Sequence, residues 1–152
     1  MNDKTVPLKI IRDKAMQACS RKEYGSSEML KKILSWGCPP DDAPSVINEL
    51  VANKYLDDCR YATAYVNDRF RFGKWGRAKI GYMLRMQGIE ESVIRNALES
   101  IDADEYLRCL KEELRKKRNS IKTAQPAEMQ AKLFRFAASR GFETEVIYRA
   151  LQ

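Results

Sequence analysis

Apolar residues recur along this chain with the spacing of helices. In three places, two apolar residues lie eight and four positions before a glycine, where they mark one face of a helix that ends near that glycine. These sets are Met29, Ile33 and Gly37; Ile80, Leu84 and Gly88; and Leu133, Ala137 and Gly141. No window shows the sustained alternation that a strand needs. The pattern therefore predicts an all-α chain.

A shorter apolar helix follows each glycine, and a longer helix precedes each apolar pair. Val93, Ile94, Ala97 and Leu98 lie at the same offsets from Gly88 as Val146, Ile147, Ala150 and Leu151 from Gly141. After Gly37 the matching set is Val46, Ile47, Leu50 and Val51, displaced by four residues by the proline-containing segment 38–44. The longer helices are expected over about 8–20, 59–70 and 105–119.

The unit is thus three helices, repeated three times. Repeat 1 is expected over about 8–55, repeat 2 over about 56–101 and repeat 3 over about 102–152, all within one domain that spans 1–152. A three-helix unit of this size buries its own apolar faces poorly. We therefore expect each copy to pack against the next in an elongated, curved, solenoid-like array.

The residues at the expected helix ends agree with this division. Ser26 and Asp57 each precede a helix, where a side-chain oxygen can accept hydrogen bonds from free backbone amides. Asp102 and Glu105 have the spacing of a capping box. The three glycines fall where a left-handed residue closes a helix, which glycine does without a Cβ clash.

Composition narrows the class of protein. The chain has 28 Lys and Arg against 21 Asp and Glu, a net charge of +7, which favours a polyanion, or a protein bound to one, as partner. It has no histidine, and its four cysteines are too widely spaced for a zinc or redox motif. Nothing in the sequence matches a phosphate-binding loop or a nucleophile with its base. We expect a non-enzymatic protein with no metal and no cofactor.

Two further interpretations concern the N-terminal region and a carboxylate pair. Charges interrupt the N-terminal apolar stretch, which predicts no signal peptide or membrane span and so a cytoplasmic protein, here expected to be monomeric. Asp57 and Asp58 are candidates for acid–base chemistry or half of a magnesium site. Because they open a helix, we interpret them as a cap and as a complement to the helix dipole.

Cations concentrate first in the second repeat, where 59–95 holds eight Lys and Arg against three Asp and Glu, with aromatic residues between them. The candidate binding residues here are Arg69, Arg71, Lys74, Trp75, Arg77, Lys79 and Arg85. Those that flank the Gly73–Gly76 linker are expected to converge on one anionic surface. The alternative is that Phe70 and Tyr82 belong to the core and the cations form a solvated rim.

A second basic run closes the expected helix 105–119. Its candidate binding residues are Lys111, Arg115, Lys116, Lys117 and Arg118. The helix begins with acidic and ends with basic residues, as its dipole favours. Glu112 and Glu113 can also pair with Lys116 and Lys117 at i,i+4. We interpret the run as a self-compensated exposed helix, with a second partner contact left open.

Three local signatures together resemble the RecX family over about residues 10–151. They are Tyr55-Leu56-Asp57-Asp58 with Arg60-Tyr61-Ala62; Gly76-Arg77 through Ile80, Leu84 and Gly88-Ile89; and Arg140-Gly141-Phe142. The chain departs from the family pattern in the proline-rich insertion after Gly37, and in Tyr61 where phenylalanine is usual. If buried, the Tyr61 hydroxyl must reach water or a partner.

The resemblance implies a function. It implies binding to RecA nucleoprotein filaments on DNA, inhibition of RecA strand exchange and ATP hydrolysis, and thereby an effect on recombination and the SOS response. The residues leave two alternatives open. One is a stand-alone helical DNA-binding protein, and the other is a helical-repeat adaptor between proteins.

Overall fold

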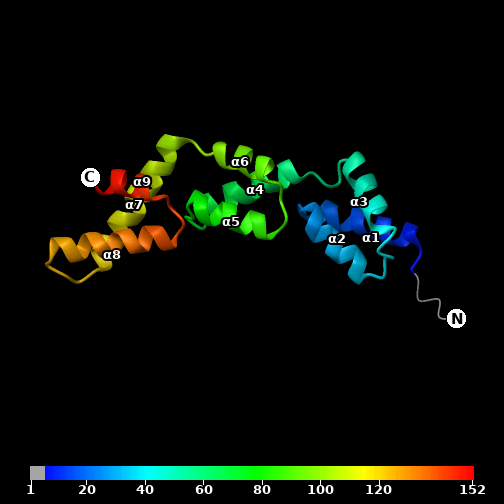
Figure 1. The fold of residues 1–152 in the computed structure, drawn as a ribbon, viewed down its shortest axis with the longest axis horizontal. Coiled ribbons are helices and arrows are strands. Elements are labelled where there is room, and N and C mark those ends of the chain that lie inside the picture. Colours follow the sequence, from blue (N-terminus) through cyan, green and yellow to red (C-terminus); the bar gives the residue numbers. More distant parts are fainter. Residues whose placement is uncertain (1–5) are drawn as a thin grey trace.

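The computed structural model describes residues 6–152, and this range is all-helical, as predicted. Its helices are α1 (Leu8–Arg21), α2 (Ser26–Ser35), α3 (Ala43–Ala52), α4 (Asp58–Arg71), α5 (Arg77–Met86), α6 (Glu91–Glu99), α7 (Ala103–Ser120), α8 (Pro126–Ser139) and α9 (Thr144–Leu151). They form three units of three helices, placed one after another along an elongated body (Figure 1). Unit 1 holds α1–α3, unit 2 holds α4–α6 and unit 3 holds α7–α9.

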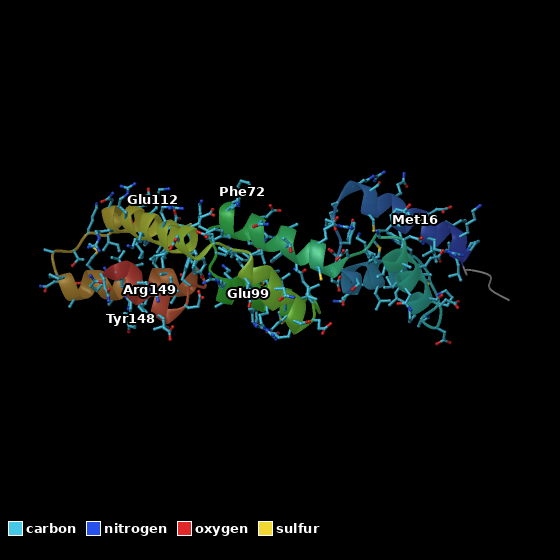
Figure 2. The ribbon with its side chains drawn as sticks, turned by 90° about the horizontal axis from the view of Figure 1, so that it is seen from above. Met16, Phe72, Glu99, Glu112, Tyr148 and Arg149 are labelled. Carbon is cyan, nitrogen blue, oxygen red and sulfur yellow. The ribbon has the colours of Figure 1, made fainter. Side chains whose placement is uncertain are left out.

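Corresponding helices of the three units lie on corresponding sides of the body. In Figure 2 the first helices, α1, α4 and α7, follow one long edge, where Phe72 and Glu112 are labelled. The labels of Glu99, Tyr148 and Arg149 lie along the opposite edge. Side chains on the outer faces of α1, α4 and α7 therefore lie along the whole length of the molecule.

Helix ends largely follow the sequence-based expectations. Gly37, Gly88 and Gly141 have φ of 98°, 79° and 94°, so all three close their helices in the left-handed region. The carboxylate of Asp57 accepts a hydrogen bond from the amide of Arg60 at 3.0 Å. Asp102 likewise accepts from the amide of Glu105 at 2.9 Å, which is one of the two hydrogen bonds of the predicted capping box.

Ser26 is not an N-cap, and here the prediction is wrong. Gly25 occupies the cap position of α2, and Ser26 is the first helical residue. The amide of Ser26 donates to Asp58 Oδ1 at 2.8 Å, and its hydroxyl donates to Asp58 Oδ2 at 2.7 Å. A carboxylate from unit 2 thus caps a helix of unit 1, and Asp58 has a structural partner that the sequence did not indicate.

The register of α3 also differs from the sequence alignment of the repeats. α6 and α9 begin three residues after their glycines, and α3 begins six residues after Gly37, so the insertion shifts the helix by three residues. Val46 and Leu50 are buried, whereas Val51 is 48% exposed. The predicted shift of four residues aligned Val46-Ile47 with Val93-Ile94 and Val146-Ile147. In the structure Val46, rather than Ile47, occupies the buried position of Ile94 and Ile147.

The apolar core is divided in two. Unit 1 buries its own cluster, which includes Ile11, Met29 and Leu50. Units 2 and 3 share one continuous cluster that runs from Ala62 to Ile147. The expectation that every copy would pack its apolar face against the next therefore holds for units 2 and 3 and is wrong for unit 1.

Units 2 and 3 meet through backbone groups. The amide of Gly76 donates to the carbonyl of Arg140 at 2.8 Å, and the amide of Ala78 donates to the carbonyl of Gly141 at 3.0 Å. The N-terminus of α5 thereby donates to carbonyls at the C-terminus of α8, so each helix end satisfies free groups of the other. A Cβ on Gly76 would overlap the carbonyl of Gly141, so this contact requires glycine.

A buried tyrosine completes this junction. The Tyr106 hydroxyl accepts from the amide of Arg77 at 2.9 Å and donates to the Glu143 carboxylate. Arg77 pairs with Glu143 at 3.1 Å and lies over the Tyr106 ring, 3.9 Å from its centroid. Burial first, and then the hydrogen bond to Glu143, raise the pKa of the Tyr106 phenol well above its ordinary value.

Replacement of Tyr106 by phenylalanine is expected to destabilise the protein by about 1.5 to 3 kcal/mol, because the amide of Arg77 and the Glu143 carboxylate each lose a partner. Denaturant unfolding followed by circular dichroism measures this loss. The matched control is Tyr61→Phe, because Tyr61 holds the same position in α4, is half-buried and bonds the Gln87 side chain. A Tyr106→Phe cost no greater than that of the control would contradict the assigned role.

Units 1 and 2 meet through side chains. Besides the bonds from Ser26 to Asp58, Arg60 pairs with Glu23 at 2.6 Å. Within residues 6–152, no backbone hydrogen bond joins the start of α2 to the glycine turn of unit 2. The first junction thus occupies the same place in the repeat as the second. It is held by polar side chains, whereas the second is held by backbone hydrogen bonds and a shared core.

Candidate nucleic-acid interface

Charge is distributed unevenly among the three rows of helices. The first helices, α1, α4 and α7, carry thirteen Lys and Arg against seven Asp and Glu. The second helices, α2, α5 and α8, carry seven against two, whereas the third helices, α3, α6 and α9, carry two against four. The positive charge of the described helices therefore lies on the first two rows, which run the length of the body.

The predicted binding residues fall into three groups according to their partners. Four are in ion pairs, namely Arg77 with Glu143, Arg85 with Glu91, Arg115 with Glu112 and Lys116 with Glu113. The pairs in α7 are at i,i+3 rather than the predicted i,i+4. The hydrogen bond from Arg115 lowers the pKa of Glu112 below its usual value, as the one from Arg85 does for Glu91.

Arg77 differs most from its expected place. It was expected to converge with Arg69, Arg71 and Lys74 on one anionic surface. Its side chain instead lies in the junction between units 2 and 3, paired with Glu143 and packed over the Tyr106 ring. Its charge is paired within the protein, and its side chain contacts residues of unit 3.

A second group surrounds Trp75. Its half-buried indole has the guanidinium of Arg69 at 5.1 Å and the ammonium of Lys79 at 4.3 Å from the ring centroid. Arg69 also lies 4.9 Å from the Tyr65 centroid. Cations over aromatic faces keep their charge while their position is fixed. Arg69, Trp75 and Lys79 thus form a preorganised cationic cluster where α4 ends and α5 begins.

The third group consists of cations that have neither an ion-pair partner nor an aromatic ring within residues 6–152. These are Arg71, Lys74, Lys111 and Arg118. Lys74 has a φ of 57°, which turns the chain sharply between α4 and α5. Lys117, the remaining predicted residue, lies over the Phe136 ring at 5.3 Å. Because the cations of the third group have no partner to give up, they are the best placed to bind an anion.

Two residues of this surface were missed by the sequence interpretation. Arg108 lies on the same exposed face of α7 as Lys111, Arg115 and Arg118, because the spacings of three, four and three residues bring these positions into one stripe. The helical period could have revealed it. Phe72 is 82% exposed at the end of α4, next to Arg71.

The alternative interpretation, in which Phe70 and Tyr82 belong to the core, is confirmed for one residue only. Phe70 is buried, whereas Tyr82 is 58% exposed.

In the range that the structure describes, none of the helices is both long and apolar enough to cross a membrane.

Comparison with known proteins places the chain among relatives that share its length. Family models for the second and third three-helix domains of RecX match residues 57–98 and 104–151. The regulatory protein RecX of Chromohalobacter salexigens is 34% identical over 140 residues, which cover 92% of this chain and 90% of that protein. The regulatory protein RecX of Vibrio vulnificus is 31% identical over 147 residues, which cover 97% and 94%.

Two solved structures share the fold. The crystal structure of RecX from Lactobacillus salivarius superposes with a TM-score of 0.89 at 20% identity, over 95% of this chain and 94% of that one. A second crystal structure of regulatory protein RecX gives 0.82 at 21% identity, over 93% and 73%. At these identities the likeness concerns the fold alone, and it matches the three-times-three arrangement of helices.

Proposed function

Since the chain belongs to the RecX family, whose members described above carry the name of regulatory proteins, we propose that it binds RecA nucleoprotein filaments and inhibits RecA strand exchange and ATP hydrolysis. It thereby modulates recombination and the SOS response. Its action is non-catalytic and is carried out in the cytoplasm by binding alone.

The observation that carries this proposal is the excess of cations on two rows of helices that run along an elongated body. The first and second rows of helices hold twenty Lys and Arg against nine Asp and Glu. The contact residues are those at the end of α4 and along α7, among them Arg71, Lys74, Lys111 and Arg118. A long basic face suits a partner that is itself long and presents phosphates or acidic side chains along its length.

A stand-alone DNA-binding protein is the main rival, and the charge of the third helices counts against it. In a three-helix DNA-binding unit the helix that enters the major groove carries the base contacts and the cations around them. Here α3, α6 and α9 hold only Arg95 and Arg149 as cations, against four carboxylates. The cationic rows are better placed to follow a backbone than to read a groove.

Titration of a RecA ATPase and strand-exchange assay with the purified protein tests the proposal directly. We expect both activities to fall as the protein is added to preformed filaments, with half-inhibition below the concentration that binds naked duplex DNA. Unchanged RecA activity at saturating amounts of the protein would refute the proposal. Tighter binding to naked duplex than to the filament would favour the rival.

A further inference from the structure

A cationic hollow lies between the last turn of α7 and the adjacent face of α8, at the end of the molecule remote from unit 1 (Figure 1). It has a volume of about 690 Å³. Its lining is formed by Lys117, Ser120, Ile121, Lys122, Lys132, Arg135, Phe136 and Ser139. Four of these side chains are cationic and none is acidic. Its size lies within the range of small-molecule sites.

The hollow is distinct from the outward stripe of α7. Lys117 follows Arg115 by two residues and precedes Arg118 by one, so it points about 160° and 100° away from them around the helix axis. It faces α8, where its ammonium lies over the Phe136 ring. α7 is four residues longer than α4, and α8 is four residues longer than α5. Unit 2 therefore lacks the extra helical turns that form the sides of the hollow.

The side chains of the hollow favour an anion that carries several charges. Both serine hydroxyls donate to carbonyls of their own helices, Ser120 to Lys117 at 2.8 Å and Ser139 to Phe136 at 2.7 Å. The remaining side-chain donors are the four cations. Arg135 and Lys122 have no ion-pair partner within the described residues. Lys132 is held at 3.1 Å by Glu128, just outside the lining.

The hollow is shallow and open to solvent. α7 and α8 form its two sides, and Ile121 and Lys122 of the linker that joins them belong to its lining. The Phe136 ring and Ile121 add apolar surface beside the cations, against which a sugar or base can pack.

We propose that this hollow binds a short chain of phosphate groups, as carried by a nucleoside triphosphate. Lys117, Lys122, Lys132 and Arg135 neutralise the phosphates through charge-assisted hydrogen bonds. The site uses none of Arg71, Lys74, Lys111 and Arg118, the residues proposed to contact the filament, so it offers the protein a second ligand.

Isothermal titration calorimetry at about 0.15 M salt, where charges more than about 8 Å apart are largely screened, tests the proposal on the full chain with inorganic tripolyphosphate and separately with ATP. We expect Lys122→Glu combined with Arg135→Glu to weaken both probes at least about tenfold, because two charge-assisted contacts are replaced by repulsion. The matched control is Lys111→Glu combined with Arg118→Glu, which changes the net charge equally on the outward face of α7. The control should bind within about twofold of the wild type.

A second variant tests the same site by a gain of affinity. The hydrogen bond from Lys132, and then that from Thr123, lower the pKa of Glu128, so this carboxylate is ionised beside the hollow. Glu128→Gln removes the competing anion and should tighten tripolyphosphate binding about threefold. Amide resonances of Phe136 and Ser139 should shift on titration. No binding by the wild type, or equal weakening in both double variants, would overturn the proposal, and neither result depends on RecA.

Discussion

Reversal of two partnerless cations, Arg71→Glu with Lys111→Glu, is expected to weaken binding to the RecA filament on the order of 100-fold at 0.1 M salt. Each phosphate contact contributes about 0.9 to the slope of log affinity against log salt, so loss of two contacts alone gives about 60-fold, and repulsion adds to this. Both side chains are exposed on helices, so the fold is retained. Fluorescence anisotropy of labelled filaments measures the affinity.

The salt dependence of the wild type sets the scale of this effect. With about five phosphate contacts, the affinity should fall on the order of 500-fold between 50 and 200 mM salt, and the double variant should lose about two units of slope. The matched control is Arg95→Glu with Arg149→Glu, which makes the same charge change on the third helices. If the control weakened binding as much as the test variant, the effect would reflect net charge and the proposed surface would be wrong.

Gly76→Ala is expected to cost about 3 to 5 kcal/mol, the largest stability effect we predict for a single substitution. The added methyl group would overlap backbone atoms of Gly141 and Phe142, which cannot move without breaking the two backbone hydrogen bonds of the junction. Units 2 and 3 share one core across this contact, so their separation exposes apolar surface in both. Thermal and urea unfolding measure the loss.

Gly25→Ala is the control for this substitution. Gly25 precedes α2 as Gly76 precedes α5, but a Cβ at Gly25 would meet side chains of Ile89 and Tyr61 at 3.5 Å, which is ordinary van der Waals contact. Its replacement should change stability by less than about 1 kcal/mol. Equal costs at the two positions would show that the second junction is no tighter than the first.

Most of the fold was predictable because local signals agree with the tertiary structure. The apolar pairs eight and four residues before each glycine become the buried faces of α2, α5 and α8, and the glycines adopt the conformation that only glycine enters freely. Because the pattern recurs three times, the bounds of the three units could be predicted from the sequence alone. The predicted register of α3 was wrong because the apolar set Val46, Ile47, Leu50 and Val51 matches the other repeats in sequence, whereas only Val46 and Leu50 of this set are buried.

The candidate site was less predictable, because a cation's availability depends on distant partners. Glu143, which holds Arg77, is 66 residues away in sequence, and Asp58, which caps α2, is 32 residues from Ser26. Neither distance leaves a sequence signal. The sequence therefore shows where cations are concentrated, whereas their division into compensated and free charges depends on the tertiary structure.

The division of the core gives the molecule one joint. Units 2 and 3 share one core and form a two-unit arm, whereas unit 1 has a core of its own and forms a head that meets the arm through side-chain contacts such as Arg60 with Glu23. We therefore expect bending to be concentrated at this junction instead of being spread along the array. Such a jointed body can follow a partner whose helical pitch varies, since the head can change direction without deforming the arm.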